Sequence, residues 1–272
     1  METLRSEKDP INTLVRIPVN GVELEGALVI PSSARGVVLF AHGSGSSRHS
    51  PRNNFVAETL RAAGIGTLLM DLLTKQEDAI YQTRFDIDLL TWRLERATQW
   101  LMEMPRAQWS PTDKPVAPSR TPVGRNPEQE PPAKAGDRVE GSRDIGYFGA
   151  STGAAAALNA AATFGSTIGA VVSRGGRPDL AMAALGSVQA PTLLIVGALD
   201  DVVIELNRKA YERLKPEKHL AIVPGATHLF EEPGTLQEVA RLAAAWFRRH
   251  LGAQRAADRT VEPHGRARGA DS

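Results

Sequence analysis

Short runs of apolar, often β-branched residues alternate along this chain with longer stretches in which apolar residues recur every three or four positions. The short runs are typical of strands, and the longer stretches are typical of amphipathic helices. Most of the strand-like runs are apolar throughout, as expected for strands covered on both faces of a parallel sheet. The pattern predicts an α/β fold with about eight strands in a mostly parallel sheet and helices on both faces. These runs lie at 36–43, 66–73, 143–150, 168–176, 191–200 and 218–228.

The chain opens with two further strand-like runs on either side of Asn20 and Gly21. Asn-Gly is a strong signal for a two-residue hairpin turn, so we expect two antiparallel strands here. The helical patterns indicate a short helix near 179–185 and longer helices elsewhere. The longer ones are expected at 53–64, 84–104, from Thr152 onwards, 204–214 and 235–251.

Two segments depart from this alternation. Residues 107–142 and 253–272 are polar and lack apolar periodicity, and the first is rich in proline, so both are predicted to be disordered. The rest of 1–252 is expected to form a single domain. The 107–142 insertion joins a helix to the start of a strand, so it leaves from the edge of the sheet opposite the carboxyl ends, where α/β proteins bind ligands.

Composition excludes several classes of function. Hydrophobic residues make up 42% of the 272 residues and the net charge is +1, so no overall field favours nucleic acid or a membrane surface. The absence of cysteine excludes disulfides, thiolate metal sites and a cysteine nucleophile. The first twenty residues have no apolar run typical of a signal peptide, and no stretch is long enough to span a bilayer. We therefore expect a cytoplasmic protein.

The sequence GASTG, centred on Ser151, joins a predicted strand to a predicted helix. A phosphate-binding loop would need a lysine here, and none is present. The remaining interpretations are a structural turn and the nucleophile elbow of serine hydrolases, G-x-S-x-G. In the elbow, the tight turn excludes larger flanking side chains and exposes the serine hydroxyl. The amide of Thr152, at the helix start, would then stabilise an oxyanion.

An acidic residue and a histidine follow in the order expected of such enzymes. Asp200 and His228 each come after a later strand, on the same edge of the sheet as Ser151. Alone, Asp200 is also consistent with a helix N-cap, and His228 with an ordinary loop histidine. Together, the spacing favours a Ser151–His228–Asp200 triad, with Asp201 as the alternative acid.

The loop after the first parallel strand, AHGSGSSRHS, is expected to supply a second oxyanion donor. Gly43 and Gly45 allow the backbone to approach a ligand closely, which makes the amide of Ser44 the preferred donor. His42 is interpreted as a structural residue that holds this loop.

The segments FAHGSGSSRHSPRN, RFDIDLL, GYFGASTGAAAAL, VVSRGGRPDL and IVGALD resemble the dienelactone hydrolase-like family of the α/β-hydrolase superfamily. The similarity covers about residues 36–250. It implies acyl transfer from an ester, lactone or thioester to water, with no metal or organic cofactor. Dienelactone hydrolases use cysteine as nucleophile, where this chain has Ser151. Some relatives are fused to phosphoribosyltransferases, but this sequence has no acidic signature for binding phosphoribosyl diphosphate.

The substrate is suggested only indirectly. The short spacing between the strands at 168–176 and 191–200 leaves no room for a large cap domain there, which favours a small-molecule acyl substrate. Several arginines fall in loops on the catalytic face and suggest an anionic substrate, with Arg48 and Arg174 as the binding residues. The alternative is that these arginines pair with Asp71, Asp86 and Asp179. The group comprises Arg48, Arg52, Arg84, Arg174 and Arg177.

Two other functions remain open from the sequence alone. One is an acyltransferase or haloperoxidase-like enzyme on the same fold, and the other is a non-catalytic binding module. The sequence does not determine the oligomeric state.

Overall fold

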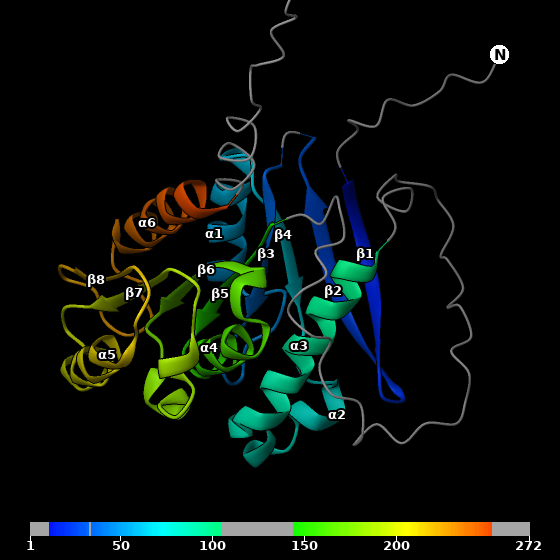
Figure 1. Cartoon of the computed structure of the whole chain (residues 1–272), viewed down its shortest axis with the longest axis horizontal. Coiled ribbons are helices and arrows are strands. Elements are labelled where there is room, and N and C mark those ends of the chain that lie inside the picture. The colour runs from blue at the N-terminus through cyan, green and yellow to red at the C-terminus, as the bar shows by residue number, and fades with distance from the viewer. Residues whose placement is uncertain (1–10, 33, 105–143, 252–272) are drawn as a thin grey trace, which may run out of the picture.

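The computed structural model describes residues 11–32, 34–104 and 144–251. The predicted disordered segments 107–142 and 253–272 lie outside these ranges, so their prediction remains untested. The described residues contain eight strands and their intervening helices (Figure 1). The strands are β1 (Ile11–Val19), β2 (Val22–Ile30), β3 (Gly36–Ala41), β4 (Gly66–Met70), β5 (Asp144–Ala150), β6 (Ile168–Arg174), β7 (Thr192–Gly197) and β8 (Lys218–Val223).

All eight strands form one sheet in the order β1-β2-β4-β3-β5-β6-β7-β8. β1 and β2 are antiparallel, and β2 also pairs antiparallel with β4, whereas β3 to β8 run parallel. The hairpin turns at Asn20 and Gly21, both at positive φ, as the sequence predicts. The carboxyl ends of six parallel strands therefore meet at one edge of the sheet.

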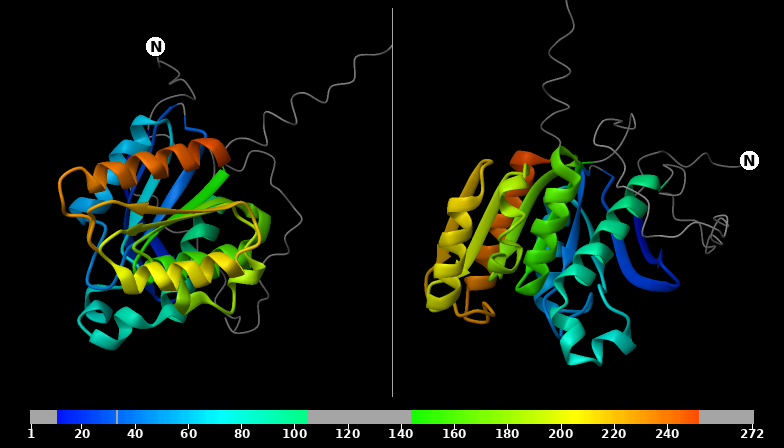
Figure 2. Two further views of the ribbon diagram at one scale, coloured as in Figure 1. Left: turned by 90° about the vertical axis from the view of Figure 1, so that its left-hand side faces the viewer. Right: turned by 60° about the horizontal axis from the view of Figure 1, so that its bottom comes forward.

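Helices cover both faces of the sheet. α1 (Pro51–Ala62) and α6 (Thr235–His250) lie against one face, while α3 (Ile87–Glu103), α4 (Thr152–Phe164) and α5 (Asp201–Arg213) lie against the other (Figures 1 and 2). The short α2 (Lys75–Asp78) and the 3₁₀ turn η1 (Tyr81–Phe85) follow β4. This arrangement confirms the predicted α/β-hydrolase fold.

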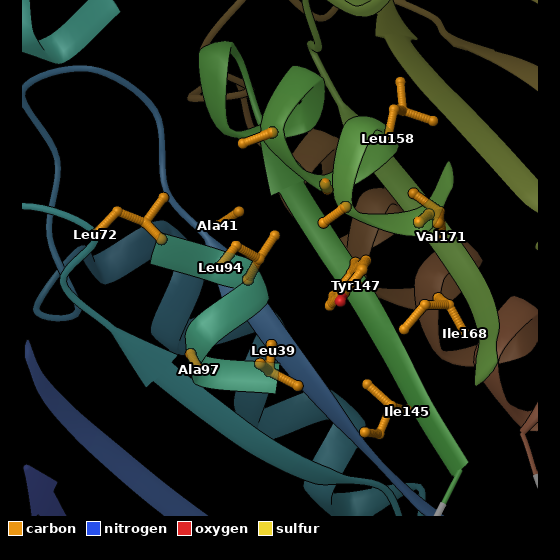
Figure 3. Close-up of a cluster of buried hydrophobic side chains, with 14 of the residues drawn as sticks. Leu39, Ala41, Leu72, Leu94, Ala97, Ile145, Tyr147, Leu158, Ile168 and Val171 are labelled. Atoms are coloured by element: carbon orange, nitrogen blue, oxygen red, sulfur yellow. The ribbon is translucent and has the colours of Figure 1, made fainter. Parts of the chain in front are cut away.

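The core on the α3 and α4 side fills the space between the sheet and these helices. Leu39, Tyr147 and Val171 project from the strands towards Leu94 and Leu158 (Figure 3). Tyr147 is fully buried, and its hydroxyl lies 2.7 Å from Thr98 Oγ1. Burial raises the pKa of this phenol, which stays neutral and hydrogen-bonded. A closely packed core of this kind fixes the positions of the strand ends.

The segment between β6 and β7 differs from its prediction. The short helix expected near 179–185 is replaced by two separate 3₁₀ turns, η5 (Pro178–Ala181) and η6 (Leu185–Ser187). Neither turn has a side-chain cap, whereas the four-residue α2 has a capping box formed by Thr74 and Glu77. No cap domain is inserted between Arg174 and Thr192, in agreement with the sequence, so this segment does not cover the neighbouring carboxyl edge of the sheet.

Candidate active site

Ser151 occupies the turn between β5 and α4 with a strained backbone, φ 50° and ψ −120°. Positive φ is costly for a residue with a side chain, and such strain persists where the surroundings enforce it. A Cβ atom at Gly149 would overlap the backbone of Ala154, and one at Gly153 would overlap the carbonyl oxygens of Ala41 and His42. The two flanking glycines are therefore required by close backbone contacts, as the elbow interpretation predicts.

Asp200 directly precedes α5, yet its side chain makes no capping hydrogen bond to the helix. Its Oδ2 instead accepts a hydrogen bond from His228 Nδ1, at 2.6 Å. The partner of the histidine is thus Asp200 and not Asp201. The bond fixes the tautomer of the ring when it is neutral, with the proton on Nδ1 and the lone pair on Nε2.

Ser151 and His228 are both anchored at the end of β6. The amide of Ser151 donates to the carbonyl oxygen of Arg174, at 3.3 Å. The next residue, Gly175, lies against the ring of His228, since a Cβ atom there would be 3.5 Å from its Cε1 and Nδ1 atoms. Within the described ranges, no hydrogen bond joins Ser151 Oγ to His228 Nε2. Such bonds are often long before substrate binds.

The two predicted oxyanion donors lie beside each other but differ in availability. The amide of Thr152 is the first of α4, so it has no partner within the helix. The amide of Ser44 donates to the hydroxyl oxygen of Thr152, at 3.1 Å. Ser44 is therefore not the free donor that the sequence suggested. The hydroxyl of Thr152 is a feature that sequence reasoning missed, because the motif assigns a role only to its backbone.

His42 links the loop at Ser44 to the segment after β4. Its Nδ1 donates to the carbonyl oxygen of Gly43 and its Nε2 accepts from the amide of Leu72, both at 3.0 Å. Burial lowers the pKa of this imidazole, which is therefore held neutral. The structural role predicted for His42 is confirmed.

Arg48 does not have the free guanidinium expected of a substrate-binding residue. Its guanidinium forms ion pairs with Asp71 and Glu25, and its backbone amide also donates a hydrogen bond to Asp71 Oδ1. The prediction of a substrate-binding Arg48 is corrected. The alternative from the sequence, pairing with Asp71, is what the structure has, and strand β2 adds Glu25 as a second partner. Three other arginines are also paired: Arg52 with Glu231, Arg84 with Asp78, and Arg177 with Asp179.

Arg174 differs from these arginines. It is 9% exposed, and its Nε and Nη1 atoms have no hydrogen-bond partner among the described residues. Burial, and secondarily the charge of Arg52, lowers its pKa to about 10. Of the two residues proposed for an anionic substrate, Arg48 is paired, and Arg174 has no acidic partner within 11–32, 34–104 and 144–251.

Residues 11–32, 34–104 and 144–251 contain neither a candidate metal site nor a candidate membrane span. No group of three histidine or acidic side chains in these ranges is arranged to hold a metal ion. No helix there combines the length and apolarity needed to cross a bilayer.

Comparison with known proteins identifies relatives of this chain. No family model matches it. Proteins from two strains of Mycobacterium tuberculosis, provisionally named phosphoribosyl transferases, are 49% identical over 237 residues. The match covers 87% of this chain but 46% of theirs, so the chain spans about half the length of these relatives.

Solved structures give a fuller match. A dienelactone hydrolase from Anabaena variabilis is 49% identical, with a TM-score of 0.74, over 89% of this chain and 99% of that one. Est1E from Butyrivibrio proteoclasticus, at 14% identity, covers 87% of this chain and 98% of its own, and shares the fold with a TM-score of 0.64. Fold, elbow and nearly full-length similarity agree: the chain belongs to the dienelactone hydrolase-like family of α/β hydrolases.

Proposed function

We propose that this hydrolase cleaves a small ester, lactone or thioester through an acyl-enzyme on Ser151. The observation that carries the proposal is the hydrogen bond between Asp200 and His228. Asp200 stands at the N-cap position of α5, yet its carboxylate bonds to the histidine and not to the helix. An aspartate bonded to Nδ1 leaves Nε2 as the proton acceptor of the histidine. The strained backbone at Ser151 supports the nucleophile role independently.

The proposed reaction has two acyl-transfer steps. His228 Nε2 takes the proton of Ser151 Oγ as this oxygen bonds to the carbonyl carbon of the substrate. The tetrahedral intermediate then collapses, the bond to the leaving group breaks, and His228 returns the proton to that group. A water molecule, deprotonated by His228, attacks the acyl-enzyme in the same way, releasing the acid and restoring Ser151. Asp200 stabilises the imidazolium formed in each step.

The oxyanion is proposed to accept hydrogen bonds from the backbone amides of Thr152 and Ser44. The first is free at the start of α4, where the helix dipole also favours negative charge. The second must exchange the hydroxyl of Thr152 for the oxyanion. A charged acceptor forms the stronger hydrogen bond, so the exchange is favourable in the transition state.

The name of the M. tuberculosis relatives is proposed to refer to the half of those proteins that this chain does not match. The match covers 46% of their length, and no acidic signature for phosphoribosyl diphosphate occurs in this sequence. A hydrolase half alone is consistent with both facts.

A fluorophosphonate probe tests the proposal directly. The intact mass of the wild-type protein should increase by a single adduct, and Ser151→Ala should remain unlabelled. Heat-denatured wild-type protein serves as the control for nonspecific labelling. If folded wild type is not labelled, or if the mutant is labelled equally, Ser151 is not an activated nucleophile and the proposal fails.

A further inference from the structure

Residues 174–177 at the end of β6, here called the β6 turn, hold the backbone of Ser151 on both sides. The amide of Ser151 donates to the carbonyl oxygen of Arg174, at 3.3 Å, and the carbonyl oxygen of Ser151 accepts from the amide of Arg177, at 3.1 Å. The ring of His228 lies against Gly175 of the same turn. The position of the β6 turn therefore sets the positions of Ser151 and His228 relative to each other.

The β6 turn contains two consecutive glycines. Gly175 has a positive φ of 50°, and a Cβ atom at Gly176 would overlap the hydroxyl of Ser173 and the methyl group of Ala154. Glycine tolerates such conformations but also has the greatest conformational freedom, so a glycine pair needs outside contacts that keep it in one place. One such contact is the hydrogen bond from the amide of Gly175 to the carbonyl oxygen of Ile195, at 2.8 Å.

Asn207 in α5 supplies a second contact. Its Nδ2 donates to the carbonyl oxygen of Gly176, at 3.0 Å, and to that of Val203, at 2.8 Å. The side chain is fully buried, and its Oδ1 has no hydrogen-bond partner among the described residues. A buried amide with an unpaired oxygen costs stability, and an apolar residue of similar volume would avoid that cost. Stability alone therefore does not account for Asn207 at this position.

The same helix follows the acid of the candidate triad. Asp200 directly precedes α5, and Asn207 comes about two helical turns later, so the two residues lie on the same side of the helix. Asp200 bonds to His228, and Asn207 bonds to the turn that contacts both Ser151 and His228. One helix thus connects all three residues of the triad.

We propose that Asn207 is a positioning residue, which fixes the β6 turn so that Ser151 Oγ and His228 Nε2 come within reach of proton transfer. The inference rests on the proposed function, since it gives Asn207 a role in the reaction of Ser151. Asn207 is buried and its side chain bonds to backbone carbonyl groups, so it does not contact the substrate. Its loss should therefore slow the chemical step without weakening substrate binding.

Asn207→Leu removes both hydrogen bonds while keeping a side chain of similar size. With 4-nitrophenyl hexanoate as substrate, kcat should fall by about ten- to a hundredfold, the effect of a small misplacement of the reacting groups, and KM should stay within about twofold. The matched control is Thr98→Val, which removes another buried hydrogen bond, the one to Tyr147. It should lower the melting temperature but leave kcat within about twofold of wild type. An unchanged kcat in the leucine variant, or an equal loss in both variants, would overturn the inference.

Asn207→Ser guards against a folding defect in the leucine variant. A serine hydroxyl can still donate to the carbonyl oxygen of Val203, one helical turn earlier, but it is too short to reach Gly176. This variant therefore removes only the contact with the β6 turn, and kcat should again fall by about tenfold. If the serine variant is as fast as wild type, Asn207 acts only within its own helix and the inference fails.

The rate of fluorophosphonate labelling separates this inference from the proposed function. Wild type should be labelled, and Asn207→Leu should be labelled at a rate about tenfold lower, because the probe requires the same alignment of Ser151 and His228. Labelling of the variant at the wild-type rate would overturn the role of Asn207 and leave Ser151 as the nucleophile. If folded wild type is not labelled, the proposed function and this inference fail together.

Discussion

Asp200 Oδ2 lies 2.6 Å from His228 Nδ1, although Asp200 occupies the position where an aspartate usually caps a helix. The carboxylate is thus directed across the edge of the sheet, from the end of β7 to the loop after β8. Two segments that are separate in sequence are joined at the point where a histidine must be oriented. The geometry favours a catalytic role for Asp200 over a local one.

Asp200→Asn should lower kcat for a neutral ester by about 10³- to 10⁴-fold, because an amide does not hold His228 in the required tautomer or stabilise its charged form. The matched control is Asp201→Asn, at the first position of α5, which should retain activity within about twofold. Steady-state kinetics with 4-nitrophenyl hexanoate measures both. A larger loss for the Asp201 variant would transfer the acid role to that residue.

Gly153→Ala should destabilise the protein severely, because the new methyl group would overlap the carbonyl oxygens of Ala41 and His42. Overpacking against a rigid backbone costs about 3 kcal/mol or more in the free energy of unfolding. Urea unfolding measures this loss. Gly186→Ala is the comparison, since no atom of the described residues lies within 4 Å of its Cβ position, and it should be nearly neutral. Similar stability of the two variants would show that the elbow tolerates larger residues.

The sequence predicts the parts of the site that depend on local pattern. The strand, glycine and helix signals around Ser151 identify the elbow because each has a local cause. Asp200 is ambiguous in sequence, since a helix cap and a triad acid both precede a helix. Only its contact with His228, 28 residues away, distinguishes them. The sequence predicts a mostly parallel sheet with helices on both faces, but not the order of its strands or which helices share a face.

Ion pairing is predicted from the sequence only in part. Asp71 pairs with Arg48 and Asp179 with Arg177, as the alternative interpretation of the arginines allows, but Glu25 was not expected at Arg48 because the pairing of β2 with β4 was not predicted. Likewise, Arg84 pairs with Asp78, while Asp86, one of the acids suggested as partners for the arginines, caps α3. Which carboxylate meets which guanidinium depends on loop conformation, which local propensity does not determine.

Thr152→Val tests whether the hydrogen bond from Ser44 positions the oxyanion donor. The substitution preserves the shape of the side chain and the amide of residue 152, but removes the oxygen that accepts from Ser44. We expect kcat to fall by about tenfold with KM nearly unchanged, somewhat less than the loss of a whole donor. Thr152→Ser retains the hydroxyl and should restore most of the rate. If the valine variant is as fast as wild type, the hydrogen bond has no positioning role.

The stability of the protein should decrease in mild acid because of His42. Its Nε2 must be unprotonated to accept from the amide of Leu72, and burial lowers the pKa of the ring in the folded protein. The unfolded chain, with an ordinary histidine pKa of about 6.5, therefore binds the proton more readily. The contribution of His42 is fully present above about pH 6.5 and is lost as pH falls towards the folded pKa.

Thermal unfolding of wild type and His42→Gln between pH 5 and 8 measures this linkage. A glutamine oxygen can accept from Leu72 without titrating, so the variant should lose less stability on acidification, even if it is less stable at pH 8. His250, whose pKa burial also lowers, contributes the same slope to both proteins and cancels in the comparison. Parallel curves for the two proteins would mean that His42 does not cause the acid sensitivity. A smaller slope in the variant would show that the neutral imidazole stabilises the loop carrying Ser44.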